Sequence, residues 1–181
     1  MEKNKYYSIN VASCIRNLPI CSVDEKTSIA AFIMFGDVEI TKKSAKMLLE
    51  KSPDFDILLT AECKGIPLCY EMARQSKKNY IVARKSEKLY MENPMWVEVK
   101  SITTANVQRL YLSKCEFEKM KNKKVLLVDD VISTGQSILA LEKLAFQAHA
   151  TIVGKACVLV EGESTNCSDI ISLGTLPIFK K

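Results

Sequence analysis

One segment in the second half of the chain combines apolar, acidic and hydroxyl residues in an order that suits phosphate binding. Residues 125–137 read VLLVDDVISTGQS, with four apolar residues, two adjacent carboxylates and a Ser/Thr/Gly turn that leads into a helical pattern. A helix N-terminus presents unpaired N–H groups and the positive end of its dipole, so it holds a phosphate well. Gly135 would let the backbone approach a ligand closely, and the hydroxyls of Thr134 and Ser137 would add donors. The segment therefore predicts a phosphate site.

The two carboxylates of this segment need another role, because they would repel a phosphate. Asp129 and Asp130 are expected to accept hydrogen bonds from sugar hydroxyls or to face a magnesium ion, which prefers oxygen ligands. The alternative interpretation is an acidic turn between a strand and a capped helix, without any ligand.

The whole segment resembles the phosphoribosyl-pyrophosphate motif of the type I phosphoribosyltransferases, which has an apolar strand, an acidic pair, a short spacer and T-G-G-T. Gln136 stands where a second glycine is usual, and Ser137 stands for threonine. The resemblance implies that Asp129 and Asp130 are catalytic and hold the ribose and magnesium. It assigns the 5′-phosphate to Val131, Ile132, Ser133, Thr134, Gly135, Gln136 and Ser137.

Two earlier loops resemble segments of the same family that bind pyrophosphate. Residues 60–66, TAECKGI, are similar to the E-A-R-G loop of adenine phosphoribosyltransferases, with a lysine that keeps the charge of arginine but not its bidentate geometry. Residues 83–91, ARKSEKLYM, are similar to R-K-x-x-K-L, and Lys85 is also expected to be catalytic. The resemblance implies pyrophosphate contacts from Glu62, Cys63, Lys64, Gly65, Arg84, Lys85 and Lys88. The alternatives are an ordinary strand–helix loop and a solvated basic loop. The Cys63 thiol is expected to be buried and inert rather than redox-sensitive.

Residues 91–112 correspond to the mobile catalytic flap of the family. Ser101, Thr103 and Thr104 stand at its tip, similar to the S-Y/F-T of xanthine-type enzymes, and the glutamate of the adenine enzymes is absent. The alternative is a solvent-exposed hairpin tip. The base therefore stays open between adenine, which the two pyrophosphate loops favour as the first choice, and xanthine or hypoxanthine, which the flap favours.

The resemblance covers about residues 17–179 and implies one domain over residues 1–181. A hood over the base is expected at about 1–40 with the C-terminal strands, and a core at about 41–160. Asp37 either holds an edge of the base or belongs to a turn before a helix.

Strands and helices alternate in the pattern needed to position these loops. Apolar runs at 56–60, 79–83, 124–128 and 151–159 predict strands, and helices are expected at 41–50, capped by Thr41, at 66–75 and at 135–146. An extended segment is expected at 6–15, and two β-rich runs at 95–101 and 107–113. This order indicates an α/β fold whose parallel sheet is covered on both faces, with ligands at the carboxyl ends of its strands.

Composition narrows the class of protein further. The 181 residues include seven scattered cysteines and one histidine, His149, which is interpreted as a turn residue. A disulfide framework, a zinc site and a Ser-His-Asp triad are therefore not indicated. The N-terminus shows no secretion signal, and no apolar run approaches the roughly 20 residues of a membrane span, so a cytoplasmic protein is expected. The net charge of +5 comes from lysines spread along the chain, most of them interpreted as solvated.

The resemblance implies transfer of a phosphoribosyl group from phosphoribosyl pyrophosphate to a purine base, with Mg²⁺, in a homodimer. The rival is a regulator of the same fold that senses phosphoribosyl pyrophosphate and binds nucleic acid. It needs a DNA-reading element, for which the roughly 55 residues ahead of the first core strand are too few, so no nucleic-acid partner is expected.

Overall fold

The computed structural model describes residues 6–100, 107–162 and 168–180. Its centre is a parallel sheet in the order β10-β9-β8-β4-β5, in which β11 also pairs with β9. The strands are β4 (Ile57–Ala61), β5 (Asn79–Ala83), β8 (Lys124–Ile132), β9 (Thr151–Glu161), β10 (Ile170–Ile171) and β11 (Gly174–Leu176). The expected α/β class is confirmed.

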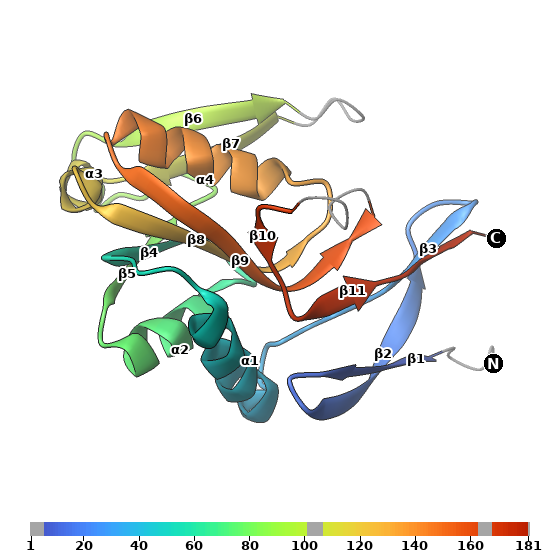
Figure 1. Cartoon of the computed structure of the whole chain (residues 1–181). Helices are drawn as coiled ribbons and strands as arrows, with labels where there is room; N and C mark the ends of the chain where they lie inside the picture. The colour runs from blue at the N-terminus through green and yellow to red at the C-terminus, as the bar shows by residue number, and fades with distance from the viewer. Residues whose placement is uncertain (1–5, 101–106, 163–167, 181) are drawn as a thin grey trace.

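Neighbouring side chains of a strand point to opposite faces of the sheet, and here both faces are covered. On β8, Leu126 and Val128 belong to one buried cluster, while Val125 and Leu127 belong to the other. The first cluster lies under α1 (Val38–Lys51) and α2 (Ile66–Ser76). The second lies under α3 (Lys114–Met120), α4 (Gln136–Gln147) and a two-stranded antiparallel ribbon of β6 (Met95–Lys100) and β7 (Val107–Leu112) (Figure 1).

A second, antiparallel sheet joins the two ends of the chain. Its order is β1-β2-β3-β12, with β1 (Tyr6–Val11), β2 (Cys14–Ser22), β3 (Thr27–Ala30) and β12 (Ile178–Lys180). The carboxyl ends of β8 and β9 point toward this small sheet (Figure 1). An ion pair ties it to the core, because Nε and Nη2 of Arg16 on β2 donate to the two carboxylate oxygens of Asp37 at 2.6 and 3.0 Å.

The sequence placed several boundaries incorrectly. The first helix begins at Val38 rather than Thr41, because Asp37 is its N-cap and accepts a hydrogen bond from the Ile40 N–H at 3.1 Å. The extended segment at 6–15 is two strands joined by a tight turn at Ala12 and Ser13, both with positive φ. The short helix α3 was not expected.

The local signal for α3 is a capping box. Ser113 accepts a hydrogen bond from the backbone of Glu116, and the Glu116 carboxylate accepts the Ser113 N–H at 2.9 Å. The helix has only seven residues, too few for a clear apolar period. His149 lies in the turn after α4, as expected.

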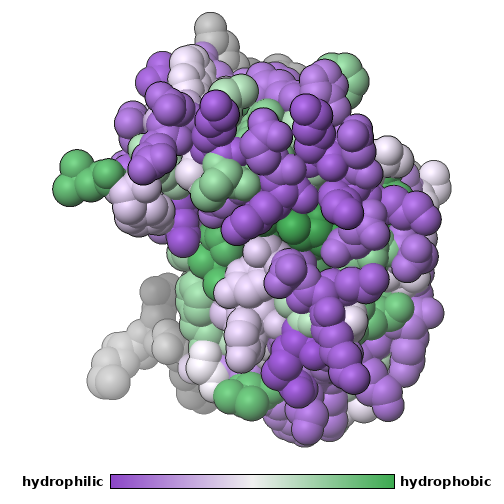
Figure 2. All heavy atoms as spheres, turned by 90° about the vertical axis from the view of Figure 1, so that its left-hand side faces the viewer, coloured by the Kyte–Doolittle hydropathy of each residue, from purple (hydrophilic) through white to green (hydrophobic). Residues whose placement is uncertain are grey.

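The surface at the amino ends of the strands is mostly hydrophilic. Figure 2 views the molecule from the left-hand side of Figure 1, and polar side chains cover most of this face. The exposed segment 121–123, which joins α3 to β8, lies on this side. In the described part of the chain, no helix combines the length and the apolar character that crossing a membrane would need.

Candidate functional site

Three loops predicted to bind ligand meet at one edge of the central sheet. They follow β4, β5 and β8, and β4 lies between the other two strands in the sheet. Nζ of Lys64, after β4, lies 3.2 Å from Oδ2 of Asp130 at the end of β8. The backbone N–H of Lys85, after β5, donates to Oε2 of Glu62 at 3.1 Å. The structure therefore brings these three loops together.

The acidic pair at the end of β8 is largely withdrawn from solvent. Asp130 is 1% exposed, and its Oδ2 has no hydrogen-bond partner among the described residues apart from the nearby Lys64 charge. The Asp130 N–H donates to Oδ1 of Asp129 at 2.9 Å. Burial, together with the neighbouring Asp130 charge, raises the pKa of Asp129 to about 8. Two crowded carboxylates of this kind favour binding of a cation or of hydroxyl donors.

Gly65 allows the loop after β4 to approach the acidic pair. A Cβ atom on Gly65 would lie 2.5 Å from Oγ1 of Thr60 and 3.0 Å from Oδ1 of Asp129. Both distances are too short for ordinary packing, so a side chain at this position would push the loop away. The peptide bond between Glu62 and Cys63 in this loop is cis.

The turn after β8 encloses a small hollow. A cavity of about 110 Å³ is lined by Asp129 and by all seven residues expected to hold the 5′-phosphate, together with Ile138. The Ile132 side chain belongs to one buried cluster, and the partly buried Val131 side chain packs against the other. Gly135 caps α4 with a φ of +73°, a left-handed conformation that favours glycine. Its surroundings are open rather than crowded.

The loop after β5 carries cations whose described contacts are few. Arg84 and Lys85 form no ion pair with other described residues, whereas Nζ of Lys88 donates to Oγ of Ser86 at 2.8 Å within the same loop. The backbone of Arg84 pairs with Tyr111 on β7, and the two N–H···O bonds measure 2.9 and 2.8 Å. The base of the β6–β7 ribbon is thereby joined to this loop.

Other expectations met different outcomes. Ser101, Thr103 and Thr104 lie outside the described residues. The Cys63 thiol is exposed, so the expectation of a buried thiol was wrong, because its loop runs over the rim of the site. For Asp37 the structure favours the turn before a helix, since its carboxylate caps α1 and pairs with Arg16.

Two residues of this region were not singled out in the sequence. The Thr60 side chain is fully buried, and its hydroxyl has no hydrogen-bond partner among the described residues, although it faces Gly65. Tyr111 supports the backbone of Arg84. A threonine at the end of an apolar strand is a weak signal for Thr60. The pairing of Tyr111 depends on contacts distant in sequence.

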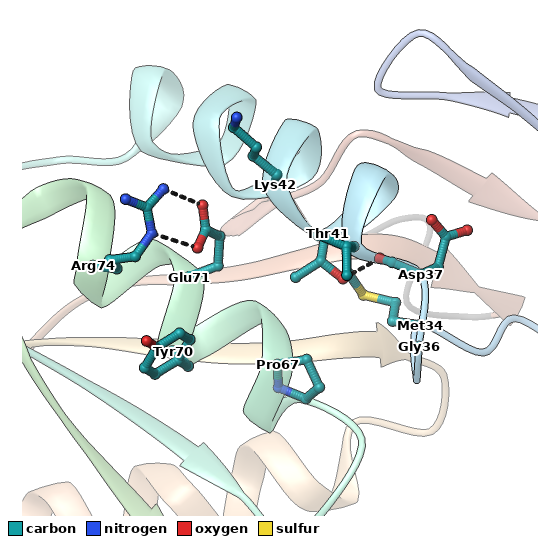
Figure 3. A pocket seen from close by; sticks show the side chains of 10 residues that line it. Met34, Gly36, Asp37, Thr41, Lys42, Pro67, Tyr70, Glu71 and Arg74 are labelled. Carbon is teal, nitrogen blue, oxygen red and sulfur yellow. Dashed lines mark hydrogen bonds and ion pairs between the residues drawn. The ribbon is translucent and has the colours of Figure 1, made fainter.

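A larger cavity of about 400 Å³ lies between α1 and α2 (Figure 3). Met34, Pro67 and Tyr70 give it an apolar wall, and at its edge Arg74 donates to both oxygens of Glu71 at 2.8 and 2.7 Å. None of the residues expected to bind phosphate or pyrophosphate lines this cavity. It is therefore separate from the three loops.

In the described site, the acidic pair of Asp129 and Asp130 offers two carboxylates to a metal ion. Within residues 6–100, 107–162 and 168–180, no group of three or more His, Cys, Asp or Glu side chains is arranged to hold a metal ion. A magnesium ion at Asp129 and Asp130 would thus need further oxygens from a ligand or from water.

Comparison with known proteins agrees with this arrangement of loops. A hypoxanthine/guanine phosphoribosyltransferase of a Methanocaldococcus species is 37% identical over 110 residues, which are 61% of this chain and 53% of that protein. A xanthine phosphoribosyltransferase of Bacillus cereus is 32% identical over 122 residues, 67% of this chain and 60% of that protein. The chain thus matches only about half to three fifths of the length of these relatives.

Similarity to solved structures supports the fold. An adenine phosphoribosyltransferase from Thermoanaerobacter pseudethanolicus superposes with a TM-score of 0.66 at 20% identity, covering 78% of this chain and 84% of that one. The match to a family model described as the phosphoribosyl transferase domain extends over residues 37–171. Because this match includes all three loops and well over half of the chain, the protein belongs to the phosphoribosyl transferase family.

Proposed function

We propose that this protein transfers the phosphoribosyl group of phosphoribosyl pyrophosphate to a ring nitrogen of a purine base and releases pyrophosphate. The observation that carries the proposal is the meeting of Lys64 with the buried Asp130 beside the hollow of the phosphate loop. It places a cation, two carboxylates and a phosphate-sized hollow within one site. These are the groups that a ribose bearing phosphates at both ends requires.

The hollow after β8 would hold the 5′-phosphate. The residues from Val131 to Ser137 line it, and the N-terminus of α4 adds the positive end of a helix dipole. Asp129 and Asp130, at the end of the same strand, would then accept hydrogen bonds from the ribose hydroxyls. This arrangement fixes the sugar from two sides and orients its anomeric carbon.

The leaving pyrophosphate would lie against the loops after β4 and β5. Lys64, Arg84 and Lys85 supply positive charge there, and Lys88 lies in the same loop as the last two. For this, the Lys64 side chain must turn from Asp130 toward the ligand or contact both groups. Cys63 and Gly65 would offer only backbone, because the Cys63 thiol lies exposed at the rim and Gly65 has no side chain.

Mg²⁺ fits this donor set. Asp130 presents a buried oxygen without a hydrogen bond, and hard carboxylate oxygens are the protein ligands that magnesium prefers. When bound with the substrate, Mg²⁺ would neutralise charge on the pyrophosphate oxygens. Asp129 and Asp130 are the side chains that would hold it, directly or through water.

In the reaction, the bond from the anomeric carbon to pyrophosphate breaks as the bond to the base nitrogen forms, and the proton that this nitrogen loses passes to water or to the released pyrophosphate. Positive charge develops on the ribose ring, and the two carboxylates beneath it stabilise that charge. Negative charge develops on the pyrophosphate, where the three cations stabilise it. Catalysis is then positioning and electrostatics, and no covalent nucleophile is needed.

The choice of base is a finer question. The relatives named above are a hypoxanthine/guanine enzyme and a xanthine enzyme, and these sequence matches favour a 6-oxopurine. The adenine enzymes resemble this chain at low identity, which supports the fold alone. The first choice of adenine from the loops after β4 and β5 is therefore weakened, and it stays a candidate in the assay. The hood over the base, the homodimer and the cytoplasmic location also stay predictions.

Turnover of phosphoribosyl pyrophosphate with adenine, hypoxanthine, guanine and xanthine, with Mg²⁺ present, tests the proposal directly. We expect one or two bases to give the nucleoside monophosphate and pyrophosphate. The variant with both Asp129→Asn and Asp130→Asn should lose turnover and keep the fold. Binding of phosphoribosyl pyrophosphate without turnover of any base would favour the regulator. If calorimetry detects no binding of phosphoribosyl pyrophosphate, both the transferase and the regulator are excluded.

A further inference from the structure

Glu62 lies in the loop expected to bind pyrophosphate, yet its carboxylate would repel that ligand. Its described contacts lead elsewhere. The Lys85 N–H donates to Oε2 of Glu62 at 3.1 Å, and the Glu62 N–H donates to the carbonyl of Ala83 at 2.8 Å. Glu62 thus forms hydrogen bonds with the residues on both sides of Arg84, at the end of β5.

Residues 83–85 also form hydrogen bonds with the β6–β7 ribbon. Arg84 exchanges two backbone hydrogen bonds with Tyr111 of β7, at 2.9 and 2.8 Å. A row of hydrogen bonds therefore runs from the loop after β4, through residues 83–85, to the stem of the β6–β7 ribbon. Glu62 supplies the only side chain in the described part of this row.

This contact matters because neighbouring side chains on an extended backbone point in opposite directions. A small rotation of the backbone at residues 84–85 would redirect the Lys85 ammonium group. The bond from the Lys85 N–H to Oε2 of Glu62 ties the backbone of residue 85 to the loop after β4. Fixing this N–H therefore fixes the direction in which the Lys85 side chain leaves the backbone.

We infer that Glu62 is a positioning residue that aims Lys85 at the pyrophosphate and touches no substrate atom itself. The inference rests on the proposed function, and it changes the role expected for Glu62 from binding to support. A carboxylate in a cationic loop is then useful, because it orders the loop at the point where the cation must be placed. Glu62 acts on the ligand only through Lys85.

Calorimetric titration with Mg²⁺ and inorganic pyrophosphate tests this on the whole chain. We expect Glu62→Ala to weaken binding about tenfold, because a misplaced charged contact loses most of its strength. Glu62→Gln should stay within about twofold, since its amide oxygen still accepts the Lys85 N–H. Glu87→Ala is the matched control. It removes an exposed carboxylate from the loop after β5 that carries Lys85, for which the described residues provide no ion pair or hydrogen bond.

A double-mutant cycle separates positioning from a general loss of structure. Lys85→Ala removes the ammonium group and keeps the backbone N–H. In that background Glu62→Ala should change the affinity for pyrophosphate by less than about twofold, because the group it positions is gone. A merely structural Glu62 would weaken binding equally in both backgrounds.

Three results would overturn the inference. The first is a Glu62→Gln variant that binds as weakly as Glu62→Ala, which would mean that the charge itself meets the ligand or its metal. The second is full affinity in Glu62→Ala or in Lys85→Ala. The third is additive effects of the two substitutions in the cycle. If the wild-type chain binds neither pyrophosphate nor phosphoribosyl pyrophosphate, the proposed function fails instead. The two failures are thus distinguishable.

Discussion

Nζ of Lys64 lies 3.2 Å from Oδ2 of Asp130, so a cation and a carboxylate that follow different strands of the sheet pair with each other. The lysine side chain is about half exposed, whereas the aspartate side chain is 2% exposed. The lysine is therefore the partner free to move. A phosphorylated ligand would compete with Asp130 for this cation, and the sugar hydroxyls or Mg²⁺ would take its place on the carboxylate.

Removal of this cation should weaken binding of the substrate. We expect Lys64→Ala to raise the Kd for phosphoribosyl pyrophosphate at least about tenfold, which corresponds to about 1.4 kcal/mol. Isothermal titration calorimetry in the presence of Mg²⁺ measures this Kd. Lys46→Ala is the control, since it removes an exposed lysine whose Nζ lies 4.0 Å from Glu50 on α1. Equal affinities of the two variants would mean that Lys64 does not contact the ligand.

Asp129 should make stability depend on pH. Its pKa is raised to about 8 by burial and by Asp130, above the ordinary value near 4 in an unfolded chain. A raised carboxyl pKa contributes stability that is present below about pH 4 and is lost as the pH rises through about 8. Asp129→Asn cannot ionise and should keep that stability.

Urea denaturation between pH 4.5 and 8.5 measures this difference. We expect Asp129→Asn to match the wild-type protein at the acidic end and to exceed it by at least about 1 kcal/mol at the alkaline end. Asp54→Asn, at an exposed residue whose carboxylate pairs with Lys124, is the control and should show no such divergence. Parallel curves for the wild-type protein and Asp129→Asn would show that Asp129 ionises normally.

Gly65 should be intolerant of a side chain because of crowding. Gly65→Ala would place a Cβ atom 2.5 Å from Oγ1 of Thr60, and we expect a loss of about 1–3 kcal/mol in the free energy of unfolding. Adding Thr60→Ala removes the obstructing hydroxyl and should recover part of the loss.

Gly135→Ala provides the contrast. Its cost of about 1 kcal/mol comes from the left-handed backbone, and the space around it is open. Thr60→Ala should therefore not rescue it. Thermal denaturation compares the two glycines in Gly65→Ala and Gly135→Ala, each with and without Thr60→Ala, and in Thr60→Ala alone. A Gly65→Ala protein as stable as the wild type would mean that the loop shifts freely.

The Arg16–Asp37 pair should hold the small sheet against α1. Arg16→Ala removes both bonds to Asp37 and the contact from Nη2 to Glu39 at 2.9 Å. We expect faster amide hydrogen exchange in β1, β2 and β3, with unchanged exchange in β4 and β8, because the sheet is released and the core is not. Lys43→Ala is the control, since it removes another partner of Glu39 without touching Asp37. Unchanged exchange in β2 would show that apolar packing alone holds the sheet.

The sequence alone was sufficient for features whose parts are contiguous. The strand, acidic pair, turn and helix of residues 124–147 follow one another along the chain, so their local order determines their shape. The alternation of apolar strands with helices likewise indicated a parallel sheet with its loops at one edge. The strand–turn–helix of this segment, the class of fold and the family could therefore be predicted from the order of the residues, and the phosphate-binding role of the turn stays a prediction.

Tertiary structure decided what depends on residues distant in the chain. Glu62 meets the backbone of Lys85, and Lys64 meets Asp130, because strand order brings separate loops together. Asp37 meets Arg16 because β2 of the small sheet lies beside the start of α1. The type of a residue determines which partners its side chain prefers, and the packing of the fold determines which partner is within reach. The burial of Thr60 and the exposure of Cys63 were decided in the same way, by how closely one loop passes another.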